Sequence, residues 1–289
     1  MYLRRRPHPS LARHIDYYWF ASGAQTPAKV QIVPSGTLEI IFNLEGDETR
    51  IYDRSDPMRI ARYSGAVVSG VQSSYFVIDV QPRASTIGVH FRPGGASALL
   101  GVPPGALTDE HANLEAIWGM QASELRERLC AARDVAWSFR ILDSELRRRL
   151  SSTARPRGEV SFALRALMRT NARIERVAKD VELSHRRLIE IFAAEVGVAP
   201  KVFGRIGRFQ RAFTMAKREA RLDWPQLALS CGYFDQPHLI REFVSLSGLA
   251  PTELLQRSAA VEGHHAALRS PLRSNLSNTR AGNAATLEH

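Results

Sequence analysis

Two stretches of the chain repeat one pattern: RVAKDVELSHRRLIEIFAAEVGVAP at residues 176–200 and QLALSCGYFDQPHLIREFVSLSGLAP at residues 226–251. One extra residue, Phe234, enters the turn of the second copy, and the apolar, glycine and proline positions match on either side of it. Each copy has the spacing of a short helix, a tight turn and a second helix, which is the layout of a helix-turn-helix. A doubled unit of this kind indicates a region that reads DNA rather than one that performs catalysis.

The turn residues predict where the second helix of each copy begins. Ser184 and Asp235 stand at N-cap positions, and Pro237 falls in a first helical turn, where its missing N–H does no harm. The helical period then predicts inward, packing positions for Leu188, Ile191, Phe192, Leu239, Ile240 and Phe243.

The outward positions of these two helices carry residue types that read base edges. Arginine donates two hydrogen bonds to guanine, glutamine pairs with adenine and glutamate accepts from cytosine. We therefore predict DNA contacts from Arg186, Arg187, Ile189 and Glu190 in the first copy and from Gln236, His238 and Arg241 in the second. For Glu190, a surface ion pair with Arg186, four positions earlier, is an equally good interpretation.

Residues 201–218, KVFGRIGRFQRAFTMAKR, are predicted to form a helix between the two copies. It carries Arg205 and Arg208, which we expect to contact DNA as well. At 1.5 Å per residue this helix is roughly 27 Å long, which nearly matches the ~34 Å between successive major-groove faces of B-DNA. We expect a rigid spacer that holds both reading helices in consecutive major grooves on one side of the duplex.

The positive charge of the chain is concentrated on the part that carries the repeat. The formal net charge is +10; residues 155–260 hold 18 Lys and Arg against 11 Asp and Glu, whereas residues 1–154 hold 18 against 16. Such an excess is expected on a surface that faces phosphates, and charge that serves only solubility is the weaker interpretation.

Residues 1–121 have the pattern of a mainly antiparallel β domain, barrel- or sandwich-like, that also contains helices. The strand-like runs are rich in β-branched and aromatic residues and alternate with turn residues. They are YYWF (17–20), VQIV (30–33), LEIIFNL (38–44), AVVSGV (66–71), YFVIDV (75–80) and TIGVHF (86–91). Together with the helical region that follows, they predict an α+β fold.

Three further segments complete the organisation. Residues 122–150 place apolar side chains at three- and four-residue steps, so we assign 122–157 to a helical linker that packs on the sheet or mediates dimerisation. Residues 158–258 are the predicted all-α DNA-binding domain. Residues 259–289 lack periodicity and are expected to be disordered, and their last three residues resemble an expression-vector scar.

The sequence offers little for catalysis or for a metal. Cys130 and Cys231 have neither metal nor redox spacing, and the histidines are scattered without partners at ligand spacing; for His90 we favour a structural role. We predict no catalytic residue, no metal and no cofactor, so the chain is not expected to be an enzyme. No signal peptide or membrane-spanning run is recognised, and a cytoplasmic location without membrane association is expected.

Residues 174–254 closely resemble the AraC/XylS family of bacterial transcription regulators. The resemblance is carried by RVAKDVELSHRRLIEIF, GVAPKVFGRIGRFQRA and LALSCGYFDQPHLIREFVSLSGLAP. It implies two helix-turn-helix units joined by a helix. Arg186, Ile189 and Glu190 then lie in the first reading helix, and Gln236, His238 and Arg241 lie in the second. Ile189 and Glu190 depart from the family's usual residues there, which leaves the base preference of the first helix open.

The N-terminal part, over about residues 5–120, resembles the poorly characterised sensor domain of some members of the same family. The similar stretches are VPSGTLEIIFNL, GVHFRPGGASALLGVPPGALTD and LEAIWG. This looser resemblance implies a regulatory or dimerising role and names no effector.

The leading hypothesis is a sequence-specific transcription regulator that binds double-stranded DNA, with an N-terminal domain for effector sensing or dimerisation. A small-molecule effector, a second copy of the chain and RNA polymerase are its further expected partners. Two alternatives stay open: a cupin-like, metal-dependent enzyme with a DNA-binding appendage, and a non-specific architectural DNA binder. The first alternative requires clustered metal ligands. The second requires equal affinity for all duplexes.

Overall fold

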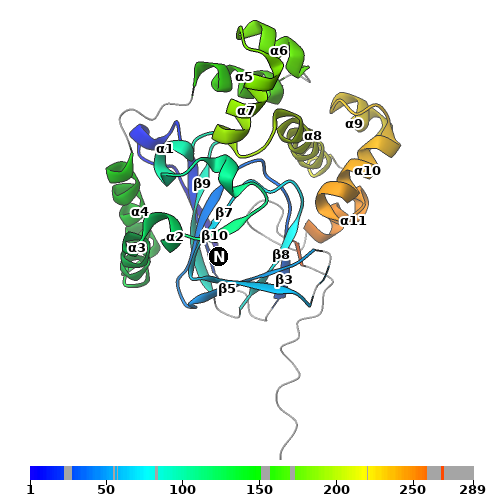
Figure 1. Cartoon of the computed structure of the whole chain (residues 1–289). Coiled ribbons are helices and arrows are strands. Elements are labelled where there is room, and N and C mark those ends of the chain that lie inside the picture. The colour runs from blue at the N-terminus through cyan, green and yellow to red at the C-terminus, as the bar shows by residue number, and fades with distance from the viewer. Residues whose placement is uncertain are drawn as a thin grey trace, which may run out of the picture.

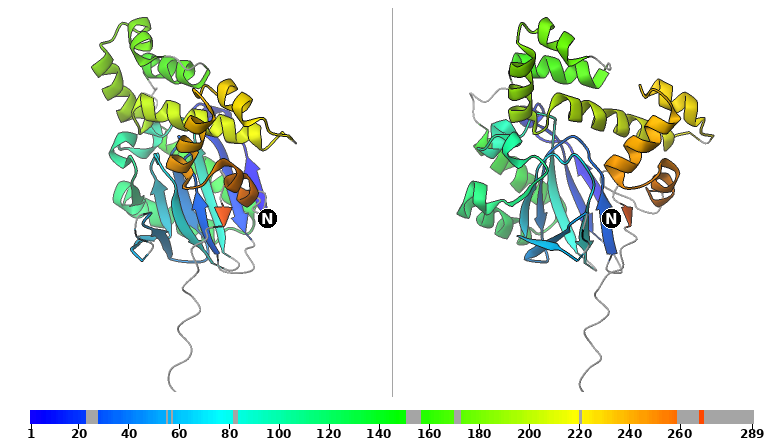
Figure 2. Two further views of the ribbon diagram at one scale, coloured as in Figure 1. Left: turned by 90° about the vertical axis from the view of Figure 1, so that its right-hand side faces the viewer. Right: turned by 45° about the vertical axis from the view of Figure 1, so that its right-hand side comes forward.

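The computed structural model describes residues 1–22, 28–54, 56, 58–81, 84–150, 157–169, 173–219, 221–258 and 268–269. An N-terminal β domain with flanking helices carries a C-terminal helical domain on one side, and the helix α8 runs across the middle of that helical domain (Figures 1 and 2). This is the predicted order of a β-rich part followed by an all-α part.

Two antiparallel sheets form the β domain. The six-stranded sheet has the order β1 (Tyr2–Arg5), β2 (Ile15–Ser22), β9 (Ser85–Phe91), β4 (Glu39–Asn43), β7 (Ala66–Ser69), β10 (His111–Asn113). The five-stranded sheet has the order β11 (Leu268–Arg269), β3 (Ala28–Ile32), β8 (Phe76–Val80), β5 (Glu48–Tyr52), β6 (Ile60–Ser64). His111 of the first sheet makes ring contacts with Tyr63 and Phe76 of the second, so these faces of the two sheets meet.

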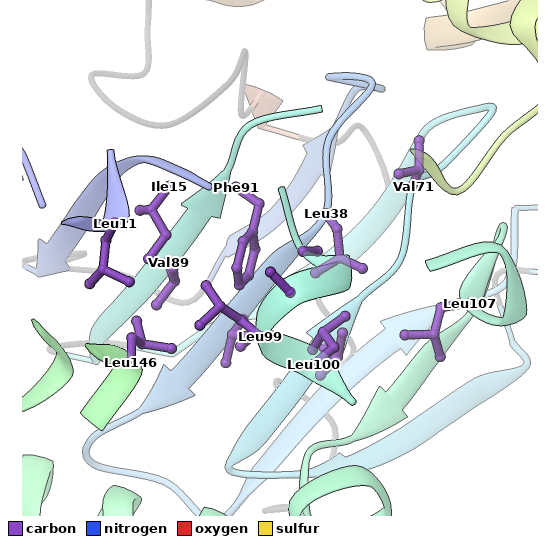
Figure 3. Close-up of a cluster of buried hydrophobic side chains, with 14 of the residues drawn as sticks. Leu11, Ile15, Leu38, Val71, Val89, Phe91, Leu99, Leu100, Leu107 and Leu146 are labelled. Atoms are coloured by element: carbon purple, nitrogen blue, oxygen red, sulfur yellow. The ribbon is translucent and has the colours of Figure 1, made fainter. Parts of the chain in front are cut away.

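The other face of the six-stranded sheet carries the main core. Alternation along β4 buries Ile40 and Phe42 there, because successive side chains of a strand point to opposite faces. The cluster in Figure 3 continues this core into the helical segments that cover the sheet. These segments are η1 (Pro9–Leu11), α1 (Ser97–Leu100), η2 (Pro104–Leu107), α2 (Glu115–Trp118), α3 (Met120–Cys130) and α4 (Val135–Arg149).

The amphipathic pattern at 122–150 is a helix pair. Asp134 separates α3 from α4 and caps α4 by accepting a hydrogen bond from the backbone N–H of Trp137 at 2.7 Å. Leu125 of α3 and Leu142 of α4 are buried in the core of the β domain. The apolar stripe of the pair therefore packs on this domain, and dimerisation stays a prediction.

Among the described residues, seven helices form the C-terminal domain. They are α5 (Gly158–Arg169), α6 (Ile174–Asp180), α7 (His185–Val196), α8 (Pro200–Ala216), α9 (Trp224–Ser230), α10 (Gln236–Ser247) and α11 (Pro251–Ser258). The first unit shares one apolar core with the β domain, since Leu188 and Phe192 belong to the same cluster as Val71 and Leu107. The second unit has a separate core, built on α8, α9, α10 and α11 together with Val33 of the β domain.

Parts of two sequence predictions fall outside the described residues. These parts are the end of the predicted helical linker, 151–156, and the expected disordered tail at 259–289 except for the two residues of β11. None of the described helices is long and apolar enough to cross a membrane.

Candidate nucleic-acid interface

The two turns begin in the same way, although Phe234 makes the second one residue longer. Leu183 N–H donates to Ala178 O at 3.0 Å in the first unit, and Tyr233 N–H donates to Ala228 O at 2.9 Å in the second. Each turn needs one residue in the left-handed region, which is Gly232 (φ 82°) in the second unit and Glu182 (φ 56°) in the first. A glycine adopts this conformation without steric cost, whereas a glutamate does not.

The predicted N-caps start both reading helices. The Ser184 side chain accepts a hydrogen bond from Arg187 N–H at 3.2 Å, and the Asp235 side chain accepts one from His238 N–H at 2.7 Å. Both helices end at glycines in the left-handed conformation, Gly197 and Gly248. The two reading helices are therefore matched residue for residue, with an offset of 51 positions.

The outward face of α7 is charged and internally paired. Arg186 Nε lies 2.9 Å from Glu190 Oε1, and Arg187 Nη1 lies 3.4 Å from Glu190 Oε2, while the Arg186 side chain is 91% exposed. The hydrogen bond from Arg186 is the main cause that holds the pKa of Glu190 below its usual value. The expected four-apart ion pair is present, so Glu190 shields part of the positive charge of α7.

The outward face of α10 presents one free cation. Arg241 is exposed, and no residue in the described part of the chain pairs with its guanidinium. His238 is half-buried; its Nδ1 accepts a hydrogen bond from Phe234 N–H at 3.3 Å, and its ring packs edge-on against Tyr233. Gln236 is half-buried at the first position of the helix. Arg241 is thus the most accessible hydrogen-bond donor on this face.

The predicted inward position of Ile240 is wrong. Leu188, Ile191, Phe192, Leu239 and Phe243 are buried as expected, but the side chain of Ile240 is 37% exposed. The buried stripe of α10 runs through Leu239, Phe243 and Leu246, and Ile240 lies about 100° around the helix from Leu239, at the edge of this stripe. The sequence contained the signal, because Ile240 is equivalent to Ile189, which the same reasoning places outward.

Arg205 and Arg208 lie between α8 and the second unit. Arg205 Nε is 2.9 Å from Glu242 Oε2, and Arg205 Nη2 is 3.2 Å from Ser245 Oγ. The Arg208 guanidinium lies 5.9 Å from the centre of the Tyr233 ring. Arg205 thus contacts α10 and Arg208 contacts the turn before it, so both arginines lie where α8 packs on the second unit.

The connecting helix is as long as expected, but its length does not set the spacing of the units. Phe192 of α7 contacts Phe203 with ring centres 5.7 Å apart, and Phe243 of α10 contacts Phe209 at 4.8 Å. These two attachment points on α8 are six residues, or about 9 Å, apart along its axis. The spacing of the reading helices therefore depends on the directions in which they leave α8.

The β domain supports both units and α8. Thr108 Oγ1 donates to Gly197 O at the end of α7, and Gln210 of α8 donates to Pro34 O. Tyr75 N–H donates to Leu246 O near the end of α10 at 2.9 Å. The C-terminal ends of both reading helices rest on the β domain, and Figure 2 shows α8 lying across its upper edge.

A groove of about 620 Å³ separates α7 from the segment 97–104 of the β domain. Arg187, Glu190 and Glu195 line the α7 side of this groove. Arg157 pairs with Glu195 at 3.0 Å, and burial raises the pKa of Glu195. Nothing in the sequence pattern predicts this groove, because it arises from the packing of two distant segments.

The described residues contain no group of three or more His, Cys, Asp or Glu side chains that could hold a metal ion. His90 lies on the six-stranded sheet, where its Nδ1 is 2.6 Å from Glu39 Oε1 and its ring stacks on Tyr17. These contacts agree with the structural role expected for His90. Cys130 is exposed and Cys231 is buried in the core of the second unit.

Two family models match parts of the chain. Residues 177–257 match a helix-turn-helix domain, and residues 3–113 match a domain of unknown function, DUF6597. No curated protein matches the chain.

The chain is similar to several solved structures. ToxT from Vibrio cholerae is 10% identical over 83% of this chain and 98% of that chain, with a TM-score of 0.47. A DNA-binding transcriptional dual regulator from Escherichia coli K-12 is 22% identical over 38% of this chain and 98% of that chain, with a TM-score of 0.31. A probable AraC family transcriptional regulator from Rhodopseudomonas palustris is 27% identical over 35% of this chain and 94% of that chain, with a TM-score of 0.30. The helix-turn-helix match spans both capped units that the repeat predicts, and residues 177–257 of the chain are a helix-turn-helix domain.

Proposed function

We propose that the chain binds a two-part operator, with α7 and α10 in consecutive major grooves on one side of the duplex. The observation that carries this proposal is the match between the two helices, which have side-chain N-caps, glycine C-caps and outward residues at the same positions. Both helices are attached to α8 and to the β domain, so their relative placement is fixed before DNA binds. A preorganised pair avoids much of the ordering cost of binding.

Base reading is assigned to the N-terminal parts of the two helices. Arg241 is exposed and free among the described residues, and a bidentate contact from it to guanine is worth about 1–3 kcal/mol of discrimination. Arg186 and Arg187 offer the same chemistry on α7, where Glu190 competes for their donors. Gln236 and His238 complete the second face. Arg205 and Arg208 act in this proposal mainly by holding α10 on α8.

Selection of bound duplexes from a random pool, followed by hydroxyl-radical footprinting, tests the two-part operator. The expected result is two protected regions about 10–10.5 base pairs apart on one face of the helix. A single protected region, or equal affinity for all duplexes, contradicts the proposal. Equal affinity for all duplexes favours the non-specific architectural binder.

The N-terminal domain is assigned a regulatory role. The support is its shared core with the first unit and the groove beside Arg187 and Glu190, because movement of the segment 97–104 changes the space around the reading face of α7. A small-molecule effector that binds this domain would then shift DNA affinity in proportion to its preference for one domain arrangement. A ligand screen by thermal melting, with operator affinity as the second readout, tests this role.

Gly105 provides a genetic test of the same role. A Cβ atom at Gly105 would lie 2.7 Å from Ala193 O of α7, so Gly105→Ala forces this contact apart. A change in operator affinity with an unchanged circular dichroism spectrum, which reports an intact fold, supports the regulatory role; unchanged affinity opposes it. We also propose homodimerisation through α3 and α4, because these helices expose Met120 and Trp137. Sedimentation tests this part. Contact with RNA polymerase is a further part of the proposal.

A further inference from the structure

We infer that Ile189 and Ile240 are a matched pair of thymine-reading residues, one in each reading helix. The inference rests on the proposed function, since it assumes that both helices enter major grooves. It adds the base class that each helix recognises at its centre: an A·T pair whose thymine methyl group meets an isoleucine side chain.

The first observation is positional. Ile189 and Ile240 are five residues after the N-caps Ser184 and Asp235, and each precedes the outward residue that carries charge, Glu190 or Arg241. The matched N-caps and C-caps of the two helices make these positions structurally equivalent in the two units. Because isoleucine occupies the equivalent position in both helices, we treat it as a shared feature of the two reading faces.

The second observation is that Ile240 lies outside the buried stripe of α10. The buried stripe of α10 is complete without Ile240, which is 37% exposed, and Val244 one turn later is 46% exposed. Gln236, Ile240 and Val244 therefore form an i, i+4, i+8 row on the accessible side of α10. The equivalent row on α7 is His185, Ile189 and Ala193, in which Ile189 is half-buried. Each row begins with a polar side chain and continues with apolar ones.

The chemistry of such a row fits A·T pairs. In the major groove, thymine presents a C5-methyl group and adenine presents the N6 donor and N7 acceptor that glutamine pairs with. Successive members of an i, i+4 row are about 6 Å apart along the helix axis, or nearly two base-pair steps of about 3.4 Å. Gln236 would therefore meet an adenine, and Ile240 would meet the methyl group of a thymine two base-pair steps further along. Because the rows are equivalent, the thymines should recur at corresponding positions in both half-sites.

The test replaces single thymines of the selected operator with deoxyuridine, which removes only the methyl group. Burial of one methyl-sized group is worth about 0.8 kcal/mol, so one replacement in each half-site should weaken binding about four-fold and the others should have little effect. Ile240→Ala should weaken binding to the thymine operator by a similar factor and abolish the effect of uracil in its own half-site only. Ile189→Ala should do the same in the other half-site.

The controls separate base reading from folding. Leu3→Ala trims an apolar side chain of β1 that is exposed to a similar extent, 40%, and should leave both uracil effects unchanged. Because Ile189 is half-buried, Ile189→Val is measured beside Ile189→Ala, and all variants are compared by thermal melting. If the two-part footprint is intact but no thymine is sensitive, or if the sensitive thymines stay sensitive in the isoleucine variants, the inference is overturned. A wild-type footprint without two half-sites overturns the proposed function and this inference with it.

Discussion

Arg205 joins the connecting helix to the second reading helix, and its replacement distinguishes a bracing residue from a phosphate contact. Its Nε is 2.9 Å from Glu242 Oε2, and the side chains of Arg205 and Glu242 are 30% and 16% exposed. Fully exposed ion pairs contribute about 0.2–1 kcal/mol, whereas hydrogen bonds to charged groups contribute about 1.5–3 kcal/mol. The partial burial of this pair indicates an intermediate cost, so Arg205→Ala should lower the free energy of unfolding by about 1–2 kcal/mol.

The same variant should leave the salt dependence of DNA binding nearly unchanged. A side chain that neutralises one phosphate contributes about 0.9 to the slope of log affinity against log salt. Denaturant unfolding and operator titrations at several salt concentrations give both quantities for Arg205→Ala, for Glu242→Ala and for the double variant. If Arg205 braces α10, the stability losses of the two single variants add up to more than the loss of the double variant. A slope that falls by about 0.9 without a loss of stability refutes the bracing role and restores Arg205 to the DNA contacts.

Three further substitutions have definite expected outcomes. Arg241→Ala should weaken operator binding by about 1–3 kcal/mol and relax the preference at one or two base pairs. Its stability should be unchanged, because no described residue pairs with Arg241. Equal weakening on all duplexes in a binding titration opposes base reading. Glu182→Gly should raise the free energy of unfolding by about 1 kcal/mol in denaturant titrations, because it gives the first turn the residue type that Gly232 provides in the second; a loss of stability would show that the left-handed conformation is not strained. Burial lowers the pKa of His111 to about 4, below its usual value of about 6.5, so the unfolded chain takes up the proton first as the pH falls. The free energy of unfolding should therefore decrease by up to about 3 kcal/mol between pH 6.5 and pH 4. His111→Phe, whose ring suits the neighbouring aromatic side chains, should remove this part of the decrease. If the melting temperature of His111→Phe depends on pH as that of the original chain does, the assignment is contradicted.

The helical domain was predictable where the signals are local. Ser184 and Asp235 set the starts of α7 and α10 because an N-cap acts within one turn of the chain. The repeat gave the number of units, and the apolar period gave most of the buried positions. Ile240 was misplaced because the period alone does not define the edge of a buried stripe, although comparison with Ile189 across the repeat corrects it.

The rest of the account depends on contacts between distant segments. The contacts of Arg205 and Arg208 follow from how α8 packs on the second unit, which no spacing in the sequence encodes. The strands β5 and β6 were not predicted, because they carry charged residues such as Arg50 and Arg62 between their apolar positions. The groove beside α7 combines residues about 90 positions apart and becomes visible only once the two domains are packed together.

The most direct test of the central claim is to locate both reading helices on one operator by tethered cleavage. His185 and Gln236 are the first residues of α7 and α10, and either becomes the only exposed cysteine when it is replaced by cysteine in a Cys130→Ser chain, since Cys231, the other described cysteine, is buried. Each cysteine carries an iron–EDTA group, and the cleavage sites are read on both strands. We predict two cleavage centres about 10–10.5 base pairs apart on the same face of the duplex. Centres that coincide, that lie on opposite faces, or that appear for one helix alone would contradict binding in consecutive major grooves.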